Sequence, residues 1–312
     1  MDENMTLTAQ DVADILRIAK NTVYELVKRG DLNHYKVGRK MRFTRPDVDS
    51  YIANSRTATR FSDEPASGAR AELPAHDRGF IICGKDSMLD VLTGYLGRRS
   101  DVDRPPLRAY VGSYAGLISL YYGEVQAATA HLWDGDTNRY NVPFVRRLLP
   151  GTSAVVIHLT KRVQGLYVAT GNPRGVQTWA DLRHGSLTLV NREKGAGSRV
   201  LLDEQLRLLK ISGKIIPGYD REVLSHITAA GVVGKGEADV GVGDLKAASM
   251  VEGVDFVPLM TEQYDLVVRK EDFDTPVVQA ILSILKSRDF REQFQHMKGY
   301  DITDMGKVLA ET

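Results

Sequence analysis

The most restrictive feature of this sequence is a repeated alternation, across residues 79–312, of short apolar runs and helical patterns. Short apolar runs bounded by turn-forming residues are typical of β-strands. The predicted strands are 80–83, 107–111, 154–159, 166–169, 187–190, 239–242, 256–259 and 266–268. Strands that alternate with helices predict an α/β domain.

Three of these strands lead through turns of small residues into helical patterns. The turns contain Ser87, Ser113 and Ser198. A strand that enters a helix through such a turn directs free backbone N–H groups and the positive end of the helix dipole at one point, which favours an anion. Each turn alone is equally well explained as ordinary helix capping. Three turns in one domain predict a cleft that encloses a small oxyanion.

Length and composition divide the chain into two folded parts. At 312 residues it is long enough for a small domain and a larger one, and 43% apolar with 26% charged residues is ordinary for a soluble globular protein. We predict a first domain over residues 1–55 and a second over 79–312. Residues 56–78, rich in Ser, Thr, Ala, Pro and charge, are predicted to be a linker.

Residues 17–45 concentrate positive charge, although the whole chain has a net charge of only +1. The carboxylates of this segment are those of Glu25 and Asp31. Its basic residues are Arg17, Lys20, Lys28, Arg29, Lys36, Arg39, Lys40, Arg42 and Arg45. Phosphate contacts require such a local concentration, so the segment is predicted to bind nucleic acid.

The same segment has the pattern of a winged helix-turn-helix. Thr8 is placed to cap a first helix, residues 20–29 have the spacing of a second, and residues 34–43 alternate around Gly38 as a hairpin. A recognition helix contacts bases from its N-terminal end, and a basic wing contacts phosphates. The predicted DNA-binding residues are Lys20, Asn21, Thr22, Tyr24, Lys28, Arg39, Lys40 and Arg42. The alternative is a small helical module that binds protein.

Several short motifs give this first domain a family resemblance. They are Leu7-Thr8 through Asp11-Val12-Ala13, Lys20-Asn21-Thr22-Val23-Tyr24, Gly30, Val37-Gly38-Arg39, and Phe43 through Asp47-Val48. Together they resemble the excisionase/MerR-type DNA-binding domain, over about one sixth of the chain. The resemblance implies binding to double-stranded DNA.

The second domain has its own signature, which covers nearly all of residues 80–270. Its segments are 131–134, 140–147, 165–166 with 171–173, 191–192 with 195–199, 218–219 and 236–241. They resemble the periplasmic-binding-protein-like domain of molybdate-type regulators, which is also appended to molybdenum-cofactor biosynthesis proteins. The resemblance implies a type II fold, in which two α/β lobes close on an oxyanion, with molybdate or tungstate as the first candidates.

The resemblance also implies particular ligand contacts. They include the three turn serines, Ser87, Ser113 and Ser198, and the neighbouring Ala196 and Gly197. Tyr264 stands where such domains return a strand to the cleft. Lys85 and Arg199 are placed to neutralise an anion, although salt bridges elsewhere are the commoner fate of such side chains. His226 starts a helical pattern and faces either the ligand or the core.

The sequence lacks the common motifs of an enzyme active site. Neither the Gly112–Gly116 turn nor the turn at Gly195 has serine at the centre of the nucleophile-elbow motif. No phosphate-binding P-loop motif is present, and the Gly241–Gly243 pair lacks the third glycine of a dinucleotide site. The lone Cys83 lies in an apolar run, and the histidines lack metal-ligand spacing. We therefore expect no catalytic residues, no metal and no cofactor. The acidic start and the lack of a long apolar run predict a cytoplasmic protein with no membrane contact.

Taken together, the sequence predicts a homodimeric transcriptional regulator that binds DNA and senses a small oxyanion. Two alternatives remain open: a molybdenum-cofactor assembly protein, and an excisionase-like architectural protein that bends DNA. A cleft of serine, glycine and tyrosine also suits sulfate, phosphate or a small organic acid.

Overall fold

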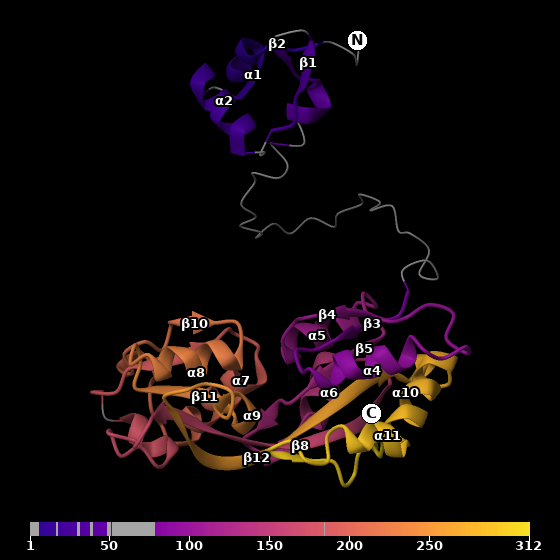
Figure 1. Ribbon diagram of the computed structural model, residues 1–312, viewed down its shortest axis with the longest axis vertical. Helices are drawn as coiled ribbons and strands as arrows, with labels where there is room; N and C mark the ends of the chain where they lie inside the picture. The colour runs from indigo at the N-terminus through magenta and orange to yellow at the C-terminus, as the bar shows by residue number, and fades with distance from the viewer. Residues whose placement is uncertain are drawn as a thin grey trace. The chain divides into compact units, whose positions relative to one another are not determined.

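The computed structural model describes residues 6–16, 18–29, 32–37, 40–48, 51, 79–183 and 185–312. The chain divides into two compact units, Met1–Ala71 and Glu72–Thr312. Figure 1 shows the course of both. The predicted linker and the predicted wing residue Arg39 lie outside the described residues.

The small unit has two helices and a hairpin. Helix α1 (Ala9–Leu16) and helix α2 (Lys20–Arg29) precede strands β1 (Tyr35–Val37) and β2 (Lys40–Arg42), which pair antiparallel. Residues 45–48 are again helical. The apolar core contains Leu7, Ala9, Val12, Ala13, Val23, Leu26, Leu32, Phe43 and Val48. The two predicted helices and the hairpin are confirmed.

Reciprocal hydrogen bonds fix the start of α1. The Thr8 backbone N–H donates to Asp11 Oδ2 over 2.8 Å, and the Asp11 N–H donates back to Thr8 Oγ1 over 3.3 Å. Thr44 and Asp47 repeat the arrangement at the start of residues 45–48, with the Thr44 N–H to Asp47 Oδ2 distance again 2.8 Å. Each pair satisfies backbone donors that a helix start leaves free, which is why both helices begin directly after a threonine.

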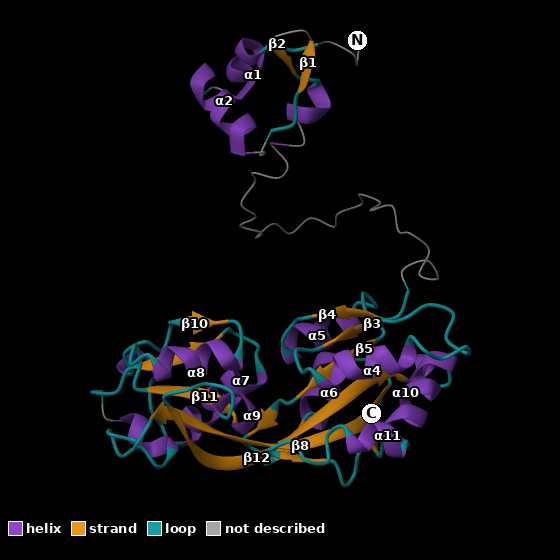
Figure 2. Ribbon diagram, in the orientation of Figure 1, coloured by secondary structure: helices purple, strands orange, loops and turns teal. Residues whose placement is uncertain are grey.

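The large unit is built on one mixed sheet that runs through two lobes (Figures 1 and 2). The strand order is β10-β9-β11-β8-β12-β5-β3-β4, and β13 and β14 pair with β8. Lobe 1 contains β3 (Ile81–Cys83), α4 (Met88–Leu96), β4 (Leu107–Ala109), α5 (Ser113–Tyr121), β5 (Ala127–Ala130), α6 (Val142–Leu148), α10 (Pro276–Lys286), α11 (Arg288–Glu292), β13 (Tyr300–Asp301) and β14 (Val308–Glu311). Strands β6 (Trp133–Asp134) and β7 (Arg139–Tyr140) form a hairpin whose Trp133 and Tyr140 pack into the core of lobe 2. Lobe 2 contains β9 (Leu189–Arg192), α7 (Gly197–Leu208), β10 (Glu222–Val223), α8 (His226–Gly234), β11 (Val240–Asp244) and α9 (Leu245–Ala248). Short 3-10 helices lie at Trp179–Arg183, Gly213–Ile215 and Lys270–Asp272.

Two long strands join the lobes. Strands β8 (Ala154–Ala169) and β12 (Val254–Arg269) each have 16 residues and pair antiparallel along their length, with irregularities at Pro258/Met260 and Tyr264/Asp265. The prediction of four separate strands here was wrong. The polar residues at the centre of each strand resemble a loop in sequence, but their backbones continue the ladder.

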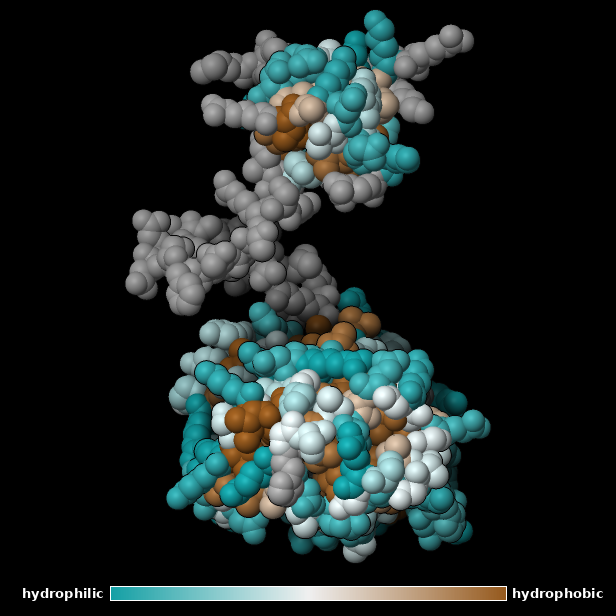
Figure 3. Space-filling model, turned by 90° about the vertical axis from the view of Figure 1, so that its left-hand side faces the viewer, coloured by the Kyte–Doolittle hydropathy of each residue, from teal (hydrophilic) through white to brown (hydrophobic). Residues whose placement is uncertain are grey.

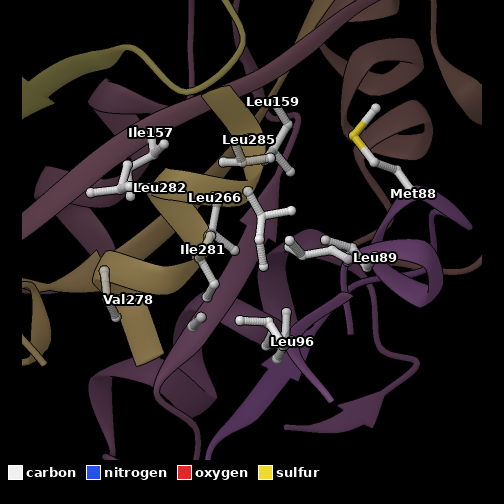
Figure 4. Packing of buried hydrophobic residues seen from close by; sticks show 14 of the residues in the cluster. Met88, Leu89, Leu96, Ile157, Leu159, Leu266, Val278, Ile281, Leu282 and Leu285 are labelled. Carbon is white, nitrogen blue, oxygen red and sulfur yellow. The ribbon is translucent and has the colours of Figure 1, made fainter. Parts of the chain in front are cut away.

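Each lobe has an apolar core on both faces of the sheet. In lobe 1, α4 and α10 pack on one face through side chains such as Leu89 and Ile281, which meet Leu266 of β12 (Figure 4). A second cluster, with Leu117 and Leu120 of α5, covers the other face. In lobe 2 the corresponding clusters centre on α7 and α8. Buried faces on both sides explain why the strands are continuous apolar runs in sequence.

The central strand β5 was not predicted from the sequence. Strand β5 consists of three alanines and a threonine, yet it pairs with both β3 and β12 and is buried throughout. Alanine is depleted in strands, so its sequence gives little β signal. Small side chains suit this position because helix α5 packs closely on it: Gly116 approaches the Cβ of Ala128.

The surface of the large unit alternates hydrophilic residues with small apolar patches on the face shown in Figure 3. Within the described part of the chain, no helix is both long enough and apolar enough to span a membrane.

Candidate functional site

A cavity of about 240 Å³ lies between the two lobes, where the carboxyl ends of β3, β4, β5, β9 and β11 meet. Crevices at the carboxyl ends of parallel strands are the usual ligand sites of open α/β sheets. Lobe 1 contributes Lys85, Asp86, Ser87, Val111, Gly112, Ser113, Thr129 and His131, while lobe 2 contributes Arg192, Ala196, Gly197, Ser225, His226, Ile227, Asp244, Lys246, Ala247 and Met250. Arg162 of β8 and Tyr264 of β12 complete the lining.

Most of the ligand contacts suggested by the sequence lie in this cavity. Its lining includes Lys85, Ser87, Ser113, Ala196, Gly197, His226 and Tyr264. Ser198 and Arg199 do not line it. The three predicted turns therefore converge on one cavity, although the third does so through Ala196 and Gly197.

The first turn is shaped by Gly84, which has φ +150° and is followed by Ser87 at the start of α4. A Cβ on Gly84 would lie 2.1 Å from the Thr129 hydroxyl, so only glycine allows β3 to end this close to β5. Ser87 Oγ accepts a hydrogen bond from Lys246 Nζ over 2.6 Å. The Ser87 proton remains available to a ligand, because this bond uses only an oxygen lone pair.

The second and third turns face each other across the cavity. Ser113 Oγ accepts from the His131 N–H over 3.3 Å, and the Tyr114 N–H donates to Gly195 O over 3.1 Å. This backbone bond connects the N-terminal turn of α5 in lobe 1 with the turn before α7 in lobe 2. The structure thus has the two lobes in contact around the cavity.

Gly197 at the start of α7 lies beneath a histidine. A Cβ at this position would lie 2.5 Å from the His131 ring, so glycine lets the helix start reach the cavity. The next residue, Ser198, is fully buried, and none of the described residues partners its hydroxyl.

Arg199 points away from the cavity. Its guanidinium bonds Asp203 Oδ2 over 3.0 Å and Glu222 Oε1 over 3.1 Å, and it stacks 4.4 Å from the centre of the Tyr219 ring. These partners already neutralise it. Arg199 lies two residues after Gly197 in α7. Because successive helical residues are about 100° apart, its side chain lies on the side of the helix away from the cavity.

Arg162, which the sequence analysis missed, lies at the centre of the site. On β8 between the lobes, it bonds Asp86 Oδ2 through Nη1 over 2.7 Å and Glu262 Oε1 through Nε over 2.5 Å. Its guanidinium also lies 4.1 Å from the centre of the Tyr264 ring. Burial is the largest influence on the pKa of Asp86 and of Glu262 and raises both. Arg162, together with Lys246 and Tyr300 at Asp86 and with His131 at Glu262, outweighs burial, and both pKa values are lowered.

Tyr264 lines the cavity wall, but its hydroxyl does not donate a hydrogen bond to an anion there. The Thr129 hydroxyl donates to Cys83 O over 3.1 Å, so the 2.8 Å bond between Thr129 and Tyr264 is donated by the tyrosine hydroxyl. The tyrosine proton is therefore already used. Its ring supports Arg162 and contacts His131 edge to face.

His226 begins helix α8 and lines the cavity rather than the core. Burial, reinforced by the positive charge of Arg192 and Arg162, holds the pKa of His226 well below its usual range. The ring is therefore neutral at pH 7. Among the residues that the structure describes, its Nδ1 has no hydrogen-bond partner.

Two side-chain bridges connect the lobes at the cavity. Lys85 of lobe 1 pairs with Glu193 of lobe 2 at 2.5 Å, and Lys246 of lobe 2 bonds Ser87 of lobe 1. Glu193 also pairs with Arg192 at 2.9 Å. Burial opposes ionisation of Glu193, but Arg192 and Lys85 outweigh it and lower the pKa.

Charged residues within or at the ends of buried strands are the sequence signal that points to this cavity. Arg162 and Glu262 are charged residues at the centre of strands whose two ends are mainly apolar, and Arg192 and Asp244 are the last residues of β9 and β11. A charge at such a position is expensive to bury unless it is paired, so it marks a site. In the described ranges, no group of three or more His, Cys, Asp or Glu could hold a metal ion. Burial raises the pKa of the Cys83 thiol to about 11.

The predicted DNA-binding side chains that the structure describes lie on the surface of the small unit. Lys20, Asn21, Thr22 and Lys28 of α2 are exposed, and Tyr24 is 39% exposed. On the hairpin, Lys40 is exposed and Arg42 is partly exposed, with Nη1 donating to Met41 O over 3.1 Å. Helix α2 therefore presents a polar face with its N-terminal end accessible.

Known proteins resemble both units. Residues 6–56 match a family described as a helix-turn-helix domain, and residues 98–286 match the PBP superfamily domain. The uncharacterized protein YvgK of Bacillus subtilis is 39% identical over 313 residues and covers all of both chains. An uncharacterized protein from the 5′ region of a ferredoxin 2Fe-2S gene of Clostridium pasteurianum is 39% identical over 112 residues, 36% of this chain and 99% of that protein.

Solved structures support the fold. An ABC-type phosphate transport receptor from Vibrio cholerae has a TM-score of 0.50 at 16% identity, over 71% of this chain and 98% of the receptor. A mutant of ArgBP from T. maritima has a TM-score of 0.50 at 15% identity, over 71% of this chain and 96% of that protein. At such identities the likeness concerns the fold alone, and it agrees with the two-lobed arrangement around the cavity. The chain belongs to the PBP superfamily, with a helix-turn-helix domain at its N-terminus.

Proposed function

We propose that this protein is a ligand-responsive transcriptional regulator, which binds double-stranded DNA through its helix-turn-helix and a small anion between the lobes of its PBP-like domain. The observation that carries the proposal is the cavity itself, because unused donors of Ser87 and Ser113 face it together with the starts of α5 and α7. An exposed, basic recognition helix belongs to the same chain.

The proposal also covers the oligomeric state, the location and the absence of catalysis. We propose a homodimer, because paired helix-turn-helix domains read two half-sites, and a cytoplasmic location, where DNA is accessible. We propose a binding role rather than catalysis, since Arg162 already pairs with the buried carboxylates of Asp86 and Glu262. Light scattering of the purified full chain tests the dimer.

The ligand acts, in this proposal, by favouring the arrangement in which the lobes are in contact. The bridges from Lys85 to Glu193 and from Lys246 to Ser87 would break if the lobes separated. A ligand that contacts both lobes binds the closed arrangement more tightly and so shifts the population towards it. Molybdate and tungstate are the first ions to test, because serine hydroxyls and helix starts suit an oxyanion.

The DNA-binding half of the proposal is tested by substituting Asn21 with Ala. Duplexes that the full chain selects from a random-sequence pool should bind this variant about 5- to 150-fold more weakly, the effect of losing a base contact worth about 1–3 kcal/mol. Unselected duplexes should bind it nearly as well as they bind the original chain. Fluorescence anisotropy at fixed salt measures both affinities.

Lys40→Ala is the matched control for a phosphate contact. The variant should bind selected and unselected duplexes more weakly by the same factor, and its affinity should depend less on salt. If Asn21→Ala also weakened both kinds of duplex equally, base reading by the start of α2 would be excluded.

The ligand half is tested by substituting Ser113 with Ala. A hydrogen bond to a charged group contributes about 1.5–3 kcal/mol, so the variant should bind the anion roughly 10-fold or more weakly. Calorimetric titration and ligand-dependent thermal stabilisation measure the loss, because a bound ligand raises apparent stability by mass action. Ser283→Ala, on the exposed face of α10, should leave binding unchanged. Equal binding by both variants would contradict the assigned cavity.

A further inference from the structure

Asp244 presents to the cavity an acceptor that none of the described residues of the large unit satisfies. It ends β11 and is only 6% exposed, and its Oδ1 accepts the Ala247 N–H over 2.8 Å at the start of α9. Its Oδ2 lies 3.8 Å from His226 Nε2, beyond hydrogen-bond distance. Across residues 79–183 and 185–312, no donor is found for Oδ2.

Nearby cations do not compensate this carboxylate directly. His226 is neutral, and Lys246 Nζ is engaged by the hydroxyls of Ser87 at 2.6 Å and Tyr300 at 3.4 Å. Arg162 is held by Asp86 and Glu262. Burial raises the pKa of Asp244, against the opposing effect of Arg162. Because Oδ2 faces the cavity, a ligand that supplies a donor there gains a hydrogen bond that no described residue provides.

The same cavity offers donors for an anionic group. Ser87 and Ser113 each keep an unused hydroxyl proton. Arg192 is nearly fully buried, and its Nε and Nη2 bond Glu193 and the carbonyls of Val223 and Leu224. Within the described part of the large unit, Nη1 of Arg192 makes no such bond. The cavity therefore has a donor-rich part, and it has a carboxylate acceptor without a donor at Asp244 Oδ2.

The size of the cavity agrees with a ligand that has more than one functional group. One water molecule needs roughly 10–15 Å³ of such space. The 240 Å³ here exceeds what four oxygens around a central atom require, and it is just below the range of about 300–1,000 Å³ found for drug-sized ligands.

We infer that the ligand is an anion that carries its own hydrogen-bond donor, an N–H or O–H group that Asp244 Oδ2 accepts. Zwitterionic amino acids and protonated oxyanions such as hydrogen phosphate share this chemistry. Molybdate, tungstate and sulfate, which carry no proton at neutral pH, leave Asp244 unsatisfied and bring charge of the same sign close to it. The inference rests on the proposed function in requiring that this cavity binds the ligand.

The test is calorimetric titration of the full chain with two sets of probes. The first set is molybdate, tungstate and sulfate, and the second is phosphate and the individual amino acids. We expect at least one member of the second set to bind at least tenfold more tightly than every member of the first. If phosphate binds most tightly, the donor is the O–H group of a protonated oxyanion. If an amino acid binds most tightly, the donor is its ammonium group.

Asp244→Asn tests the role of the carboxylate. Asparagine keeps an oxygen for the Ala247 N–H but adds a donor where Asp244 has only acceptors. We expect the preference to reverse, with donor-bearing anions at least tenfold weaker and unprotonated oxyanions at least tenfold tighter. Asp274→Asn, in an exposed turn before α10, is the matched control and should leave both affinities unchanged.

Two results would overturn the inference. One is molybdate, tungstate or sulfate as the tightest ligand of the original chain, which would mean that Asp244 is protonated and itself donates; the proposed regulator would then stand. The other is an unchanged preference in Asp244→Asn. Failure of every probe to bind, or absence of DNA binding, would instead count against the proposed function and remove the basis of the inference with it.

Discussion

Replacing Arg162 with Met is expected to lower the free energy of unfolding of the large unit by about 3–5 kcal/mol, the usual cost of removing one partner from a buried ion pair. The variant leaves the carboxylates of Asp86 and Glu262 buried without their cation. Urea denaturation followed by tryptophan fluorescence measures this energy. Both tryptophans, Trp133 and Trp179, lie in the large unit and report on it specifically.

A matched control and a rescue variant isolate the cause. Arg207 is an exposed arginine that pairs with Glu204 and Asp136, and Arg207→Met should change stability little because solvent already screens these pairs. The triple change of Arg162→Met, Asp86→Asn and Glu262→Gln should recover much of the loss, since no unpaired charge remains buried. If Arg162→Met cost no more than Arg207→Met, the buried cluster would not be a determinant of stability.

The effect of Arg162→Met should also depend on pH. In the original chain the pKa values of Asp86 and Glu262 are lowered in the folded state, so their stabilisation is present above their unfolded pKa values and is lost as pH falls through the folded ones. Without Arg162, burial raises both pKa values instead, and protonation relieves the variant. The difference in unfolding energy between the two chains should therefore shrink as pH falls from 7 towards 4.

Gly165→Ala is expected to have the second large effect, a loss of about 2–3 kcal/mol at the upper end of overpacking costs. Gly165 lies on β8 opposite Pro258 of β12, next to the irregularity where the strands pass between lobes. An added Cβ would lie 2.0 Å from Val257 O and 2.9 Å from the Phe256 ring. Because both close neighbours belong to β12 and one is backbone, the strands must separate. Urea denaturation measures the loss, and weaker anion binding should accompany it.

Gly94→Ala provides the opposite result as a control. Gly94 lies within helix α4, and no other group approaches the position of its Cβ. Alanine should therefore raise the free energy of unfolding by about 0.5–1 kcal/mol through helix propensity alone. A loss from both glycine changes would indicate a general sensitivity of the lobe, not a close contact between β8 and β12.

The parts of the molecule that the sequence determined are those in which local patterns coincide with burial. Thr8 and Thr44 mark helix starts because their hydroxyls and the acids three residues later satisfy local donors. The turns with Ser87 and Ser113 could also be recognised from the sequence, because all the residues of a turn between a strand and a helix are adjacent in the chain. Their number in one domain predicted a shared cleft, and the resemblance to a two-lobed fold agreed with it.

The charged centre of the site depended on contacts distant in sequence. Arg162 meets Asp86 and Glu262, which are 76 and 100 residues away, and the lobe bridge from Lys246 to Ser87 spans 159 residues. In sequence these residues resemble surface charges or loop residues, which is why β8 and β12 were each divided in two. Arg199 shows the converse error, because closeness to a turn in sequence did not place its side chain in the cavity.

The alternation of strands and helices, with its Gly and Ser turns, thus determined by itself that this chain would form an α/β unit with a cavity at its strand ends. Only the tertiary structure decided what that cavity contains. Local propensity and hydrophobic pattern act over a few residues, whereas charge pairing between lobes depends on how two long strands bring distant segments together. The unmatched oxygen of Asp244, which is the most specific feature of the site, exists only in that arrangement.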